Sequence, residues 1–153
     1  PPQKELDLLT RQVSVMKVII VGCGKPGSDL ARELTKSGHV DTVIDVDPAA
    51  LKVLGNNFAR GTIVGTGFDK DVLGQANIRM ADAIVARNKS DEANALIGRM
   101  TKHIYRVPRV IARFYNPRKA EIYLALGLQT ISITTWGVQR TMEILKYRQL
   151  DTV

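Results

Sequence analysis

The stretch from Met16 to Gly27, MKVIIVGCGKPG, constrains the fold of this chain more than any other. Its apolar residues 18–21 predict a buried strand, and three glycines follow within the next six positions. Gly22 would allow a tight turn, Gly24 would let the backbone approach a phosphate, and Gly27 would let a helix pack closely on the strand. The stretch therefore predicts a strand, turn and helix whose N-terminal amides face the phosphates of a nucleotide.

A carboxylate stands where such a unit needs one. Residues 42–45 predict a second strand that ends at Asp45, about 20 residues after the glycine loop, as in dinucleotide-binding folds. An aspartate at this position hydrogen-bonds the 2′-OH of an adenosine ribose, and it disfavours a 2′-phosphate. We therefore expect an adenine nucleotide with a free 2′-OH, and not NADP.

Strand-length apolar runs alternate with helical patterns along the whole chain. This pattern predicts an α/β fold, a Rossmann-like doubly wound parallel six-stranded sheet with a C-terminal crossover helix. Helix N-caps are expected at Asp47, Asp69, Ser90 and Asn116. The predicted strands are residues 17–21, 42–45, 62–64, 83–86, 110–113 and 130–133, and the predicted helices are about 25–37, 48–54, 69–76, 91–103, 117–126 and 136–148.

Composition narrows the function classes. At 153 residues and 44% hydrophobic content, the chain suits one globular domain, without a second substrate-binding domain. No apolar run is long enough for a membrane span, and the N-terminus lacks signal-peptide character, which predicts a cytoplasmic protein. We divide the chain into an arm at 1–15, a nucleotide-binding domain at 16–134 and a dimerisation helix at 135–153.

Cys23 is the only cysteine, which excludes an internal disulfide and a multi-cysteine metal site. Within the glycine loop it is either a small spacer or a thiol acidified by the helix N-terminus. The net charge of +7 is uneven, because residues 87–153 carry twelve basic and five acidic side chains while residues 1–86 carry ten of each. Without aromatic interleaving or a groove-reading motif, this excess does not predict nucleic-acid binding.

Ligands of open parallel sheets bind beyond the carboxyl ends of the strands. Asp91 and Asn94, in the first turn of the helix at 91–103, lie on the same predicted rim, although dipole complementation and surface exposure would also explain them. The predicted cofactor-binding residues are Gly22, Cys23, Gly24, Lys25, Pro26, Gly27, Asp45, Val46, Gly65, Thr66, Asn88, Asp91, Asn94 and Arg113. No catalytic or metal-ligating residue is predicted.

A longer ordered series of motifs runs from about residue 16 to 146. It includes the glycine stretch, VIDVD at 43–47, ADAIV at 81–85, SDEAN at 90–94, VPRVIAR at 107–113 and NPRKAEIY at 116–123. Together these resemble the RCK or KTN family, nucleotide-binding domains of potassium transport regulators, and GFDKDVL at 67–73 with Trp136 resembles the stand-alone Trk-type subunits.

The resemblance implies a cytoplasmic regulatory subunit, held at the inner face of the membrane by a potassium transporter subunit. Its cofactor would be NAD, NADH, ATP or ADP. The nucleotide that is bound would alter the geometry of a dimer, of a ring, or of a pair with another RCK subunit. Family members dimerise through the last helix. Here that helix carries Trp136 and an apolar stripe of Val138, Met142 and Leu145, which intramolecular packing would also explain.

Four positions depart from the family pattern. Thr66 replaces an aspartate, Asn88 a threonine and Lys25 an arginine, and Pro26 removes one backbone N–H from the helix terminus. Arg113 and Tyr115 stand where calcium-gated relatives place carboxylates, which argues against calcium control. These departures leave open a non-binding structural subunit of a mixed RCK ring.

A small NAD-dependent oxidoreductase is the other alternative. Tyr115 and Lys119 have the spacing of a dehydrogenase acid pair, but Asn116 and Pro117 predict a helix start that leaves Tyr115 outside the helix. We therefore expect no enzymatic activity.

Overall fold

The computed structural model describes residues 14–58 and 61–147. Their strands form one six-stranded sheet in the order β3-β2-β1-β4-β5-β6, and every pair of neighbours is parallel, which confirms the predicted fold class. The reversal of strand order beside β1 creates the crevice where open α/β sheets bind ligands. The strands are β1 (Lys17–Val21), β2 (Val40–Asp45), β3 (Thr62–Val64), β4 (Ala83–Ala86), β5 (Arg109–Arg113) and β6 (Gln129–Ile131).

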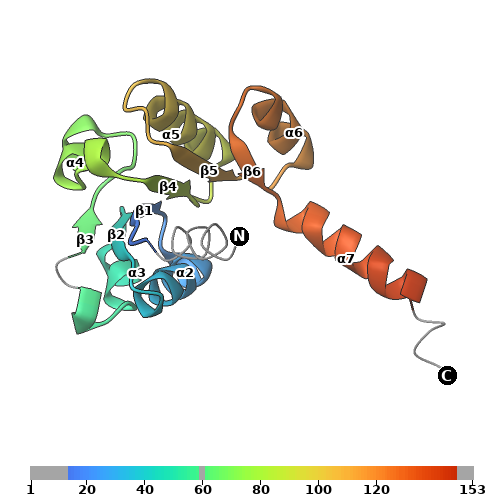
Figure 1. The fold of residues 1–153 in the computed structure, drawn as a ribbon, viewed down its shortest axis with the longest axis horizontal. Coiled ribbons are helices and arrows are strands. Elements are labelled where there is room, and N and C mark those ends of the chain that lie inside the picture. Colours follow the sequence, from blue (N-terminus) through green and yellow to red (C-terminus); the bar gives the residue numbers. More distant parts are fainter. Residues whose placement is uncertain (1–13, 59–60, 148–153) are drawn as a thin grey trace, which may run out of the picture.

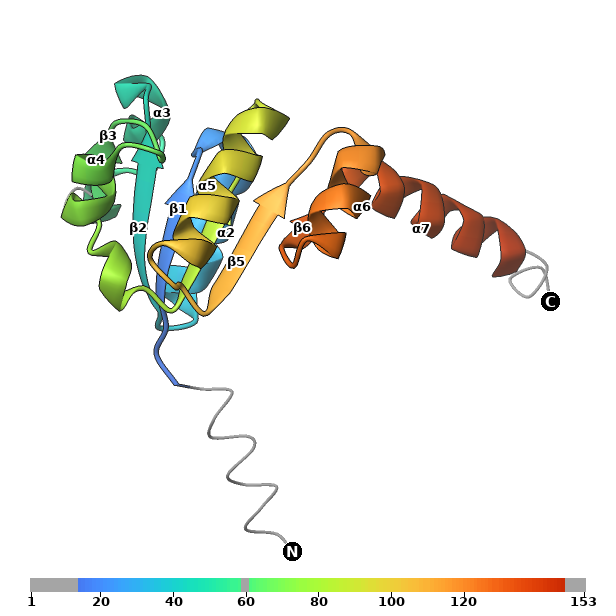
Figure 2. The same cartoon turned by 90° about the horizontal axis from the view of Figure 1, so that it is seen from above.

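Helices cover both faces of the sheet, as Figure 1 and Figure 2 show. One face carries α2 (Gly24–Lys36) and α3 (Pro48–Lys52), and the other carries α4 (Lys70–Gln75), α5 (Asp91–His103) and α6 (Pro117–Ala125). Two short 3-10 turns, Asn56–Phe58 and Ile78–Met80, join these elements, and the sequence pattern did not predict them.

The central strand β1 supplies both halves of the core. Ile19 and Val21 pack in the cluster beneath α4 and α5, whereas Val18 and Ile20 pack in the cluster beneath α2 and α3. Successive side chains of a strand point to opposite faces, so a strand that is apolar at every position must be covered on both sides. The core therefore fixes β1 at the centre of the sheet, with the glycine loop at its carboxyl end.

All four predicted N-caps are confirmed, because each side chain accepts a backbone N–H of the first helical turn. Asp47 accepts from Ala49 at 2.9 Å and Ser90 accepts from Ala93 at 3.2 Å. These bonds satisfy donors that a helix start leaves without partners. They fix where α3 and α5 begin, and therefore where the loops at the rim of the sheet end.

The C-terminal helix starts earlier than the sequence predicted. The predicted strand at residues 130–133 is wrong at its end, because β6 stops at Ile131 and α7 (Ile133–Tyr147) begins two residues later. The N–H of Trp136 donates to the carbonyl of Ser132 at 3.0 Å, which closes the first helical turn. An alternating segment of this length is compatible with either structure, so tertiary context decides.

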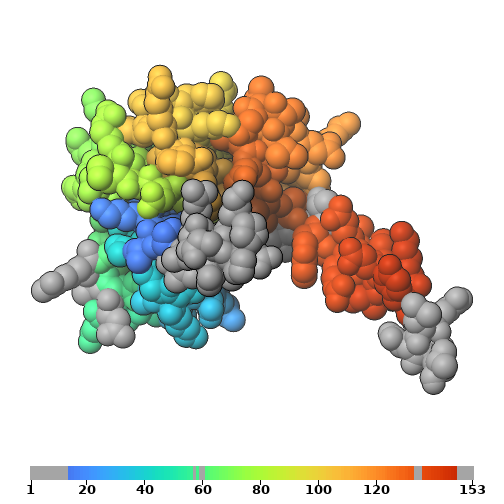
Figure 3. Space-filling view, in the orientation of Figure 1, coloured from blue at the N-terminus to red at the C-terminus, as the bar shows by residue number. Residues whose placement is uncertain are grey.

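Helix α7 projects away from the sheet and its covering helices (Figure 1, Figure 3). Its apolar side chains are exposed: Trp136 is 66%, Val138 60%, Met142 50% and Leu145 55% accessible. The stripe therefore does not pack on the described part of its own chain. The boundaries of the three predicted segments stay a prediction, and residues 1–13 of the predicted arm lie outside the described residues. Within the described residues, no helix has the length and apolar content that crossing a bilayer requires.

Asp41, on β2, is expected to give stability a pH dependence. Its Oδ1 accepts from the Thr35 hydroxyl at 2.9 Å, its Oδ2 is buried without a hydrogen-bond partner among the described residues, and burial raises the pKa of this carboxyl above its ordinary 3.8. As pH rises, the unfolded chain therefore loses this proton first. The free energy of unfolding therefore falls as pH rises from the pKa of Asp41 in the unfolded chain to its raised pKa in the folded protein. At neutral pH the full cost of burying the charged carboxylate is present.

We expect Asp41→Asn to raise the melting temperature at pH 7 by about 2 °C, and to lose this advantage below about pH 4. Thermal unfolding followed by circular dichroism between pH 3 and 8 measures both effects. Asp29→Asn, at an exposed carboxylate on α2, is the control and should change little. An advantage that does not depend on pH would contradict the assignment.

Candidate nucleotide-binding cleft

A cleft of about 730 Å³ opens at the carboxyl ends of β1, β2, β4 and β5. The structure brings most of the predicted contact residues together here, although they come from distant parts of the sequence. The predicted residues that line the cleft are Gly22, Cys23, Gly24, Lys25, Pro26, Gly27, Asp45, Val46, Gly65, Thr66, Asn88 and Arg113. Asp91 and Asn94 do not line it.

Two of the three glycines of the loop, Gly22 and Gly27, pack directly against neighbouring backbone. Gly22 has a φ of +96°, and a Cβ there would lie 2.7 Å from the carbonyl oxygen of Arg87. A Cβ on Gly27 would lie 2.5 Å from the carbonyl oxygen of Gly22. Gly24, with a φ of +42°, differs because a Cβ there would meet only Pro26 Cδ, at 3.9 Å. Two glycines thus hold the loop close to the sheet and helix, and the third leaves space beside the backbone.

The carboxylate of Asp45 holds the loop in place. Its Oδ2 accepts the backbone N–H of Cys23 at 2.7 Å, and its Oδ1 accepts the N–H of Asp47 at 2.9 Å. A carboxylate has about four lone-pair positions, so both oxygens can still accept a ribose hydroxyl. Asp45 therefore organises the cleft and remains available to a sugar.

Pro26 lies within the first turn of α2, which begins at Gly24. The first N–H groups of a helix have no acceptor within the helix, so proline at this position breaks no helical bond. The amides of Gly24 and Lys25 remain at the end of the helix that faces the cleft. The helix terminus has one donor fewer, as the sequence predicted, but its positive end still faces the cleft.

Asn94 and Asp91 support the rim of the cleft from behind. Asn94 is fully buried; its Oδ1 accepts the N–H of Asn88 at 2.8 Å, and its Nδ2 donates to the carbonyls of Asn88 at 2.9 Å and Arg113 at 2.8 Å. Asp91 accepts the backbone N–H groups of Tyr115 at 2.8 Å and Asn116 at 3.1 Å. Together they tie the loop after β4 to the loop after β5.

Sequence reasoning missed several cleft residues, of which Arg87, Lys89 and Tyr115 matter most. Arg87 follows the buried strand β4 directly and Tyr115 follows β5 by two positions, so the strand-end rule that selected Asn88 also applies to them. Burial, followed by the charge of Arg113, lowers the pKa of the Arg87 guanidinium. Because Arg87 and Lys89 line the cleft in addition to Arg113, the rim after β4 and β5 carries more basic side chains than predicted.

Cys23 is a spacer. The side chain is 2% exposed, and burial followed by the charge of Asp45 raises the pKa of its thiol above 9.0. The acidified thiol considered from the sequence is therefore wrong, because burial and the nearby carboxylate of Asp45 both disfavour the thiolate.

The residues that resemble a dehydrogenase pair are engaged elsewhere. Tyr115 precedes the N-cap of α6, as predicted, and its hydroxyl accepts from Nη2 of Arg113 at 2.8 Å. Lys119 forms an ion pair with Glu92. Within residues 14–58 and 61–147, no group of three or more His, Cys, Asp or Glu side chains lies close enough to hold a metal ion.

The strand order, the glycine loop and the carboxylate at the end of β2 define a Rossmann-type nucleotide-binding domain. The profile of the TrkA-N domain matches residues 18–134, and the chain belongs to this family. The Trk system potassium uptake protein TrkA of Streptomyces coelicolor is 38% identical over 130 residues, which cover 85% of this chain and 58% of that protein. This chain thus spans a little over half the length of that relative.

Solved structures agree on the fold. The TrkA-N domain of the Escherichia coli inner membrane protein ybaL superposes with a TM-score of 0.77 at 17% identity, over 86% of this chain and 98% of that one. The GsuK channel bound to NAD superposes with a TM-score of 0.73 at 19% identity, over 88% of this chain and 24% of that one. A further GsuK structure contains ADP. Together with the TrkA-N match and the relative from Streptomyces coelicolor, this agreement confirms the resemblance to the RCK family.

Proposed function

We propose that this chain binds an adenine nucleotide with a free 2′-OH and regulates a membrane potassium transporter from the cytoplasmic side. The observation that carries the proposal is the position of Asp45 beside the glycine loop in one open cleft. The carboxylate would accept the ribose hydroxyl, and the amides of Gly24 and Lys25 would bind the phosphates. No chemical step is part of this function.

The proposal also rests on the relatives. The similar TrkA of Streptomyces coelicolor is a potassium uptake protein, and the GsuK structures contain NAD or ADP. A nucleotide can change the geometry of an assembly only if it binds one arrangement more tightly than another. We propose that the two arrangements differ in how α7 lies relative to the cleft. The connection runs through β5, which ends in the cleft at Arg113 and pairs with β6, the strand that precedes α7.

We further propose that α7 joins two copies of this chain into a dimer, which can build a ring. The stripe of Val138, Met142 and Leu145 is exposed along the helix. A groove of about 570 Å³ beside its first turn is lined by apolar side chains of α6, β6 and α7, including Leu124, Ile131 and Trp136. A second copy would cover both surfaces, because exposed apolar patches of this kind mark interaction sites.

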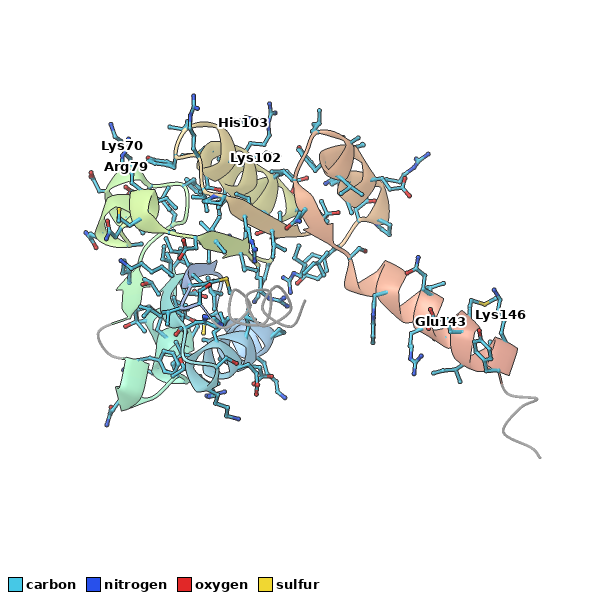
Figure 4. All side chains as sticks on the ribbon, in the orientation of Figure 1. Lys70, Arg79, Lys102, His103, Glu143 and Lys146 are labelled. Carbon is cyan, nitrogen blue, oxygen red and sulfur yellow. The ribbon has the colours of Figure 1, made fainter. Side chains whose placement is uncertain are left out.

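We expect Met142→Glu to shift the dimer toward monomer by at least about tenfold in dissociation constant, because it places a charge in the apolar contact. Sedimentation equilibrium at several concentrations measures the shift. Lys70→Glu, at an exposed position of α4 far from α7 (Figure 4), introduces the same carboxylate outside the proposed contact and is the control. Equal behaviour of the two variants would show that the stripe is not the interface.

Isothermal titration with NAD, NADH, ATP and ADP tests the nucleotide proposal. We expect saturable binding by the unmodified chain and a loss of at least about tenfold in Asp45→Asn, which keeps an acceptor oxygen but removes the charge. Asp69→Asn, a conservative change at an N-cap outside the cleft, is the control. If none of the four binds to a folded dimer, the non-binding structural subunit becomes the better explanation.

A further inference from the structure

The segments that enter β1, β4 and β5 lie together at the amino edge of the sheet, opposite the cleft. In Figure 2 the entries of β1 and β5 are at the lower edge, below the arrowheads. The N–H of Lys17 donates to Oδ2 of Asp82 at 2.8 Å, and the N–H of Arg109 donates to the carbonyl of Asp82 at 3.2 Å. These bonds hold the three entries side by side. We call residues 14–17, 78–82 and 102–109 the entry surface.

The entry surface is strongly basic. Its segments carry five lysine and arginine side chains against one carboxylate, that of Asp82. The five are Lys17, Arg79, Lys102, Arg106 and Arg109. Among residues 14–58 and 61–147, none of the five takes part in an ion pair. Lys102 is the one that a helix end explains, because its Nζ donates to the carbonyl of Gly127. The surface therefore keeps a net positive charge that this part of the chain does not neutralise.

Arg106 has a backbone conformation that glycine would adopt more easily. Its φ is 55°, in the left-handed region where a Cβ is costly. The turn around it is fixed, because the N–H of Ile104 donates to the carbonyl of Met100 at 2.9 Å and the N–H of Val107 donates to that of Thr101 at 3.0 Å. The turn alone would therefore favour glycine. The exposed arginine side chain points to a role outside the fold.

Each of the three entry segments also exposes one large apolar side chain. Val15 is 62%, Met80 60% and Ile104 61% accessible. The guanidinium of Arg79 lies 5.3 Å from the centre of the Tyr105 ring, which places the segment before β4 against the segment before β5. Apolar side chains are thus interspersed among cations. A bilayer of anionic lipids matches both kinds of group over a broad area, because it offers phosphates at its surface and acyl chains just below them.

We propose that the entry surface docks directly on an anionic phospholipid bilayer. The guanidinium groups of Arg79, Arg106 and Arg109 contact lipid phosphates by charge-assisted hydrogen bonds, and Met80 and Ile104 insert between the headgroups. The cleft, at the carboxyl ends of the strands, then faces away from the bilayer and stays open to a nucleotide. The inference goes beyond the proposed function, because lipid binding of this kind requires neither a nucleotide nor a transporter.

Co-sedimentation of the full chain with vesicles tests the inference, with phosphatidylcholine vesicles that either contain or lack phosphatidylglycerol. We expect binding only where phosphatidylglycerol is present, and weaker binding as the salt concentration rises. Arg106→Gly should weaken the partition coefficient about fivefold, which is the contribution of one basic residue near an anionic surface. Glycine suits the turn, so this variant should be no less stable than the unmodified chain. Lys70→Gln removes one exposed charge where α4 begins, at the opposite edge of the sheet, and is the matched control.

A second pair of variants tests the apolar contact. Ile104→Ser should weaken the partition coefficient at least about threefold, whereas Leu96→Ser, at an exposed position within α5, should leave it unchanged. Thermal unfolding shows that each variant is folded. The inference is overturned if either pair behaves alike, or if both kinds of vesicle bind equally. Binding of soluble polyglutamate without binding of vesicles also overturns it, and assigns the surface to an acidic protein segment. Each of these results leaves the nucleotide titrations, and with them the proposed function, unaffected.

Discussion

Gly27→Ala is expected to destabilise the fold by about 3 kcal/mol and to weaken nucleotide binding more than tenfold, a rough magnitude for overpacking beside backbone. The new Cβ would lie 2.5 Å from the carbonyl oxygen of Gly22. Gly22 cannot move away freely, because its own Cα faces the backbone of Arg87 and Asn88. The clash would therefore displace the whole turn, together with the amides that face the phosphates.

Gly74→Ala is the matched control for this substitution. Gly74 lies in α4, and a Cβ there meets nothing within 4 Å. Alanine is favoured over glycine inside a helix by roughly 0.5 to 1 kcal/mol, so the control should be neutral or slightly stabilising. Urea denaturation and titration with ATP measure both variants. Similar stability and affinity in the two would mean that the close approach of Gly27 to Gly22 does not hold the loop.

Asn94→Ala is expected to cost about 3 kcal/mol of stability, because it removes the partners of buried backbone groups and leaves a small cavity. The groups that lose a partner are the N–H of Asn88 and the carbonyls of Asn88 and Arg113. Because these groups belong to the loops after β4 and β5, affinity for ATP should fall as well. Denaturation curves and calorimetric titration give the two quantities.

Asn116→Ala provides the comparison for Asn94→Ala. Asn116 also bonds backbone through its side chain, but at an exposed N-cap, where its Oδ1 accepts from Arg118 at 2.9 Å. Loss of a cap costs about 1 kcal/mol, and the freed N–H can bind water. If Asn94→Ala were no more damaging than this variant, Asn94 would not support the rim.

Local signals in the sequence predicted most of the fold. Buried parallel strands read as apolar runs, and the caps at Asp47, Asp69, Ser90 and Asn116 marked the helix starts. Four of the six strands match their predicted ranges to within one residue at both ends. The exceptions are β2, which begins at Val40, two residues before its predicted start, and β6, which ends at Ile131, two residues before its predicted end. After Ile131 the chain turns into α7 instead of continuing as a strand, and tertiary contacts that a local pattern does not contain decide this.

The cleft was harder to predict because strand-end rules select positions and do not show which way a side chain points. Asn94 was predicted as a contact, yet it faces inward to support the backbone of Asn88 and Arg113. Arg87 was missed, although it occupies the rim position one step past β4. The state of Cys23 was equally hidden, because the burial that raises the pKa of its thiol depends on the surrounding fold.

Because the apolar side chains of α7 are exposed, the stability of this helix depends on contacts with a second copy of the chain, if the proposed dimer forms. This helix has 15 residues, and isolated helices of about that length are only marginally stable in water. Contacts with the rest of its own chain supply little, since the apolar side chains from Trp136 to Tyr147 remain at least half accessible. If two copies pair through α7 as proposed, dilution would remove the covering partner and shift the helix–coil equilibrium of this segment toward coil. Assembly would complete the folding of the chain, and the helical content of α7 would report how many copies have met.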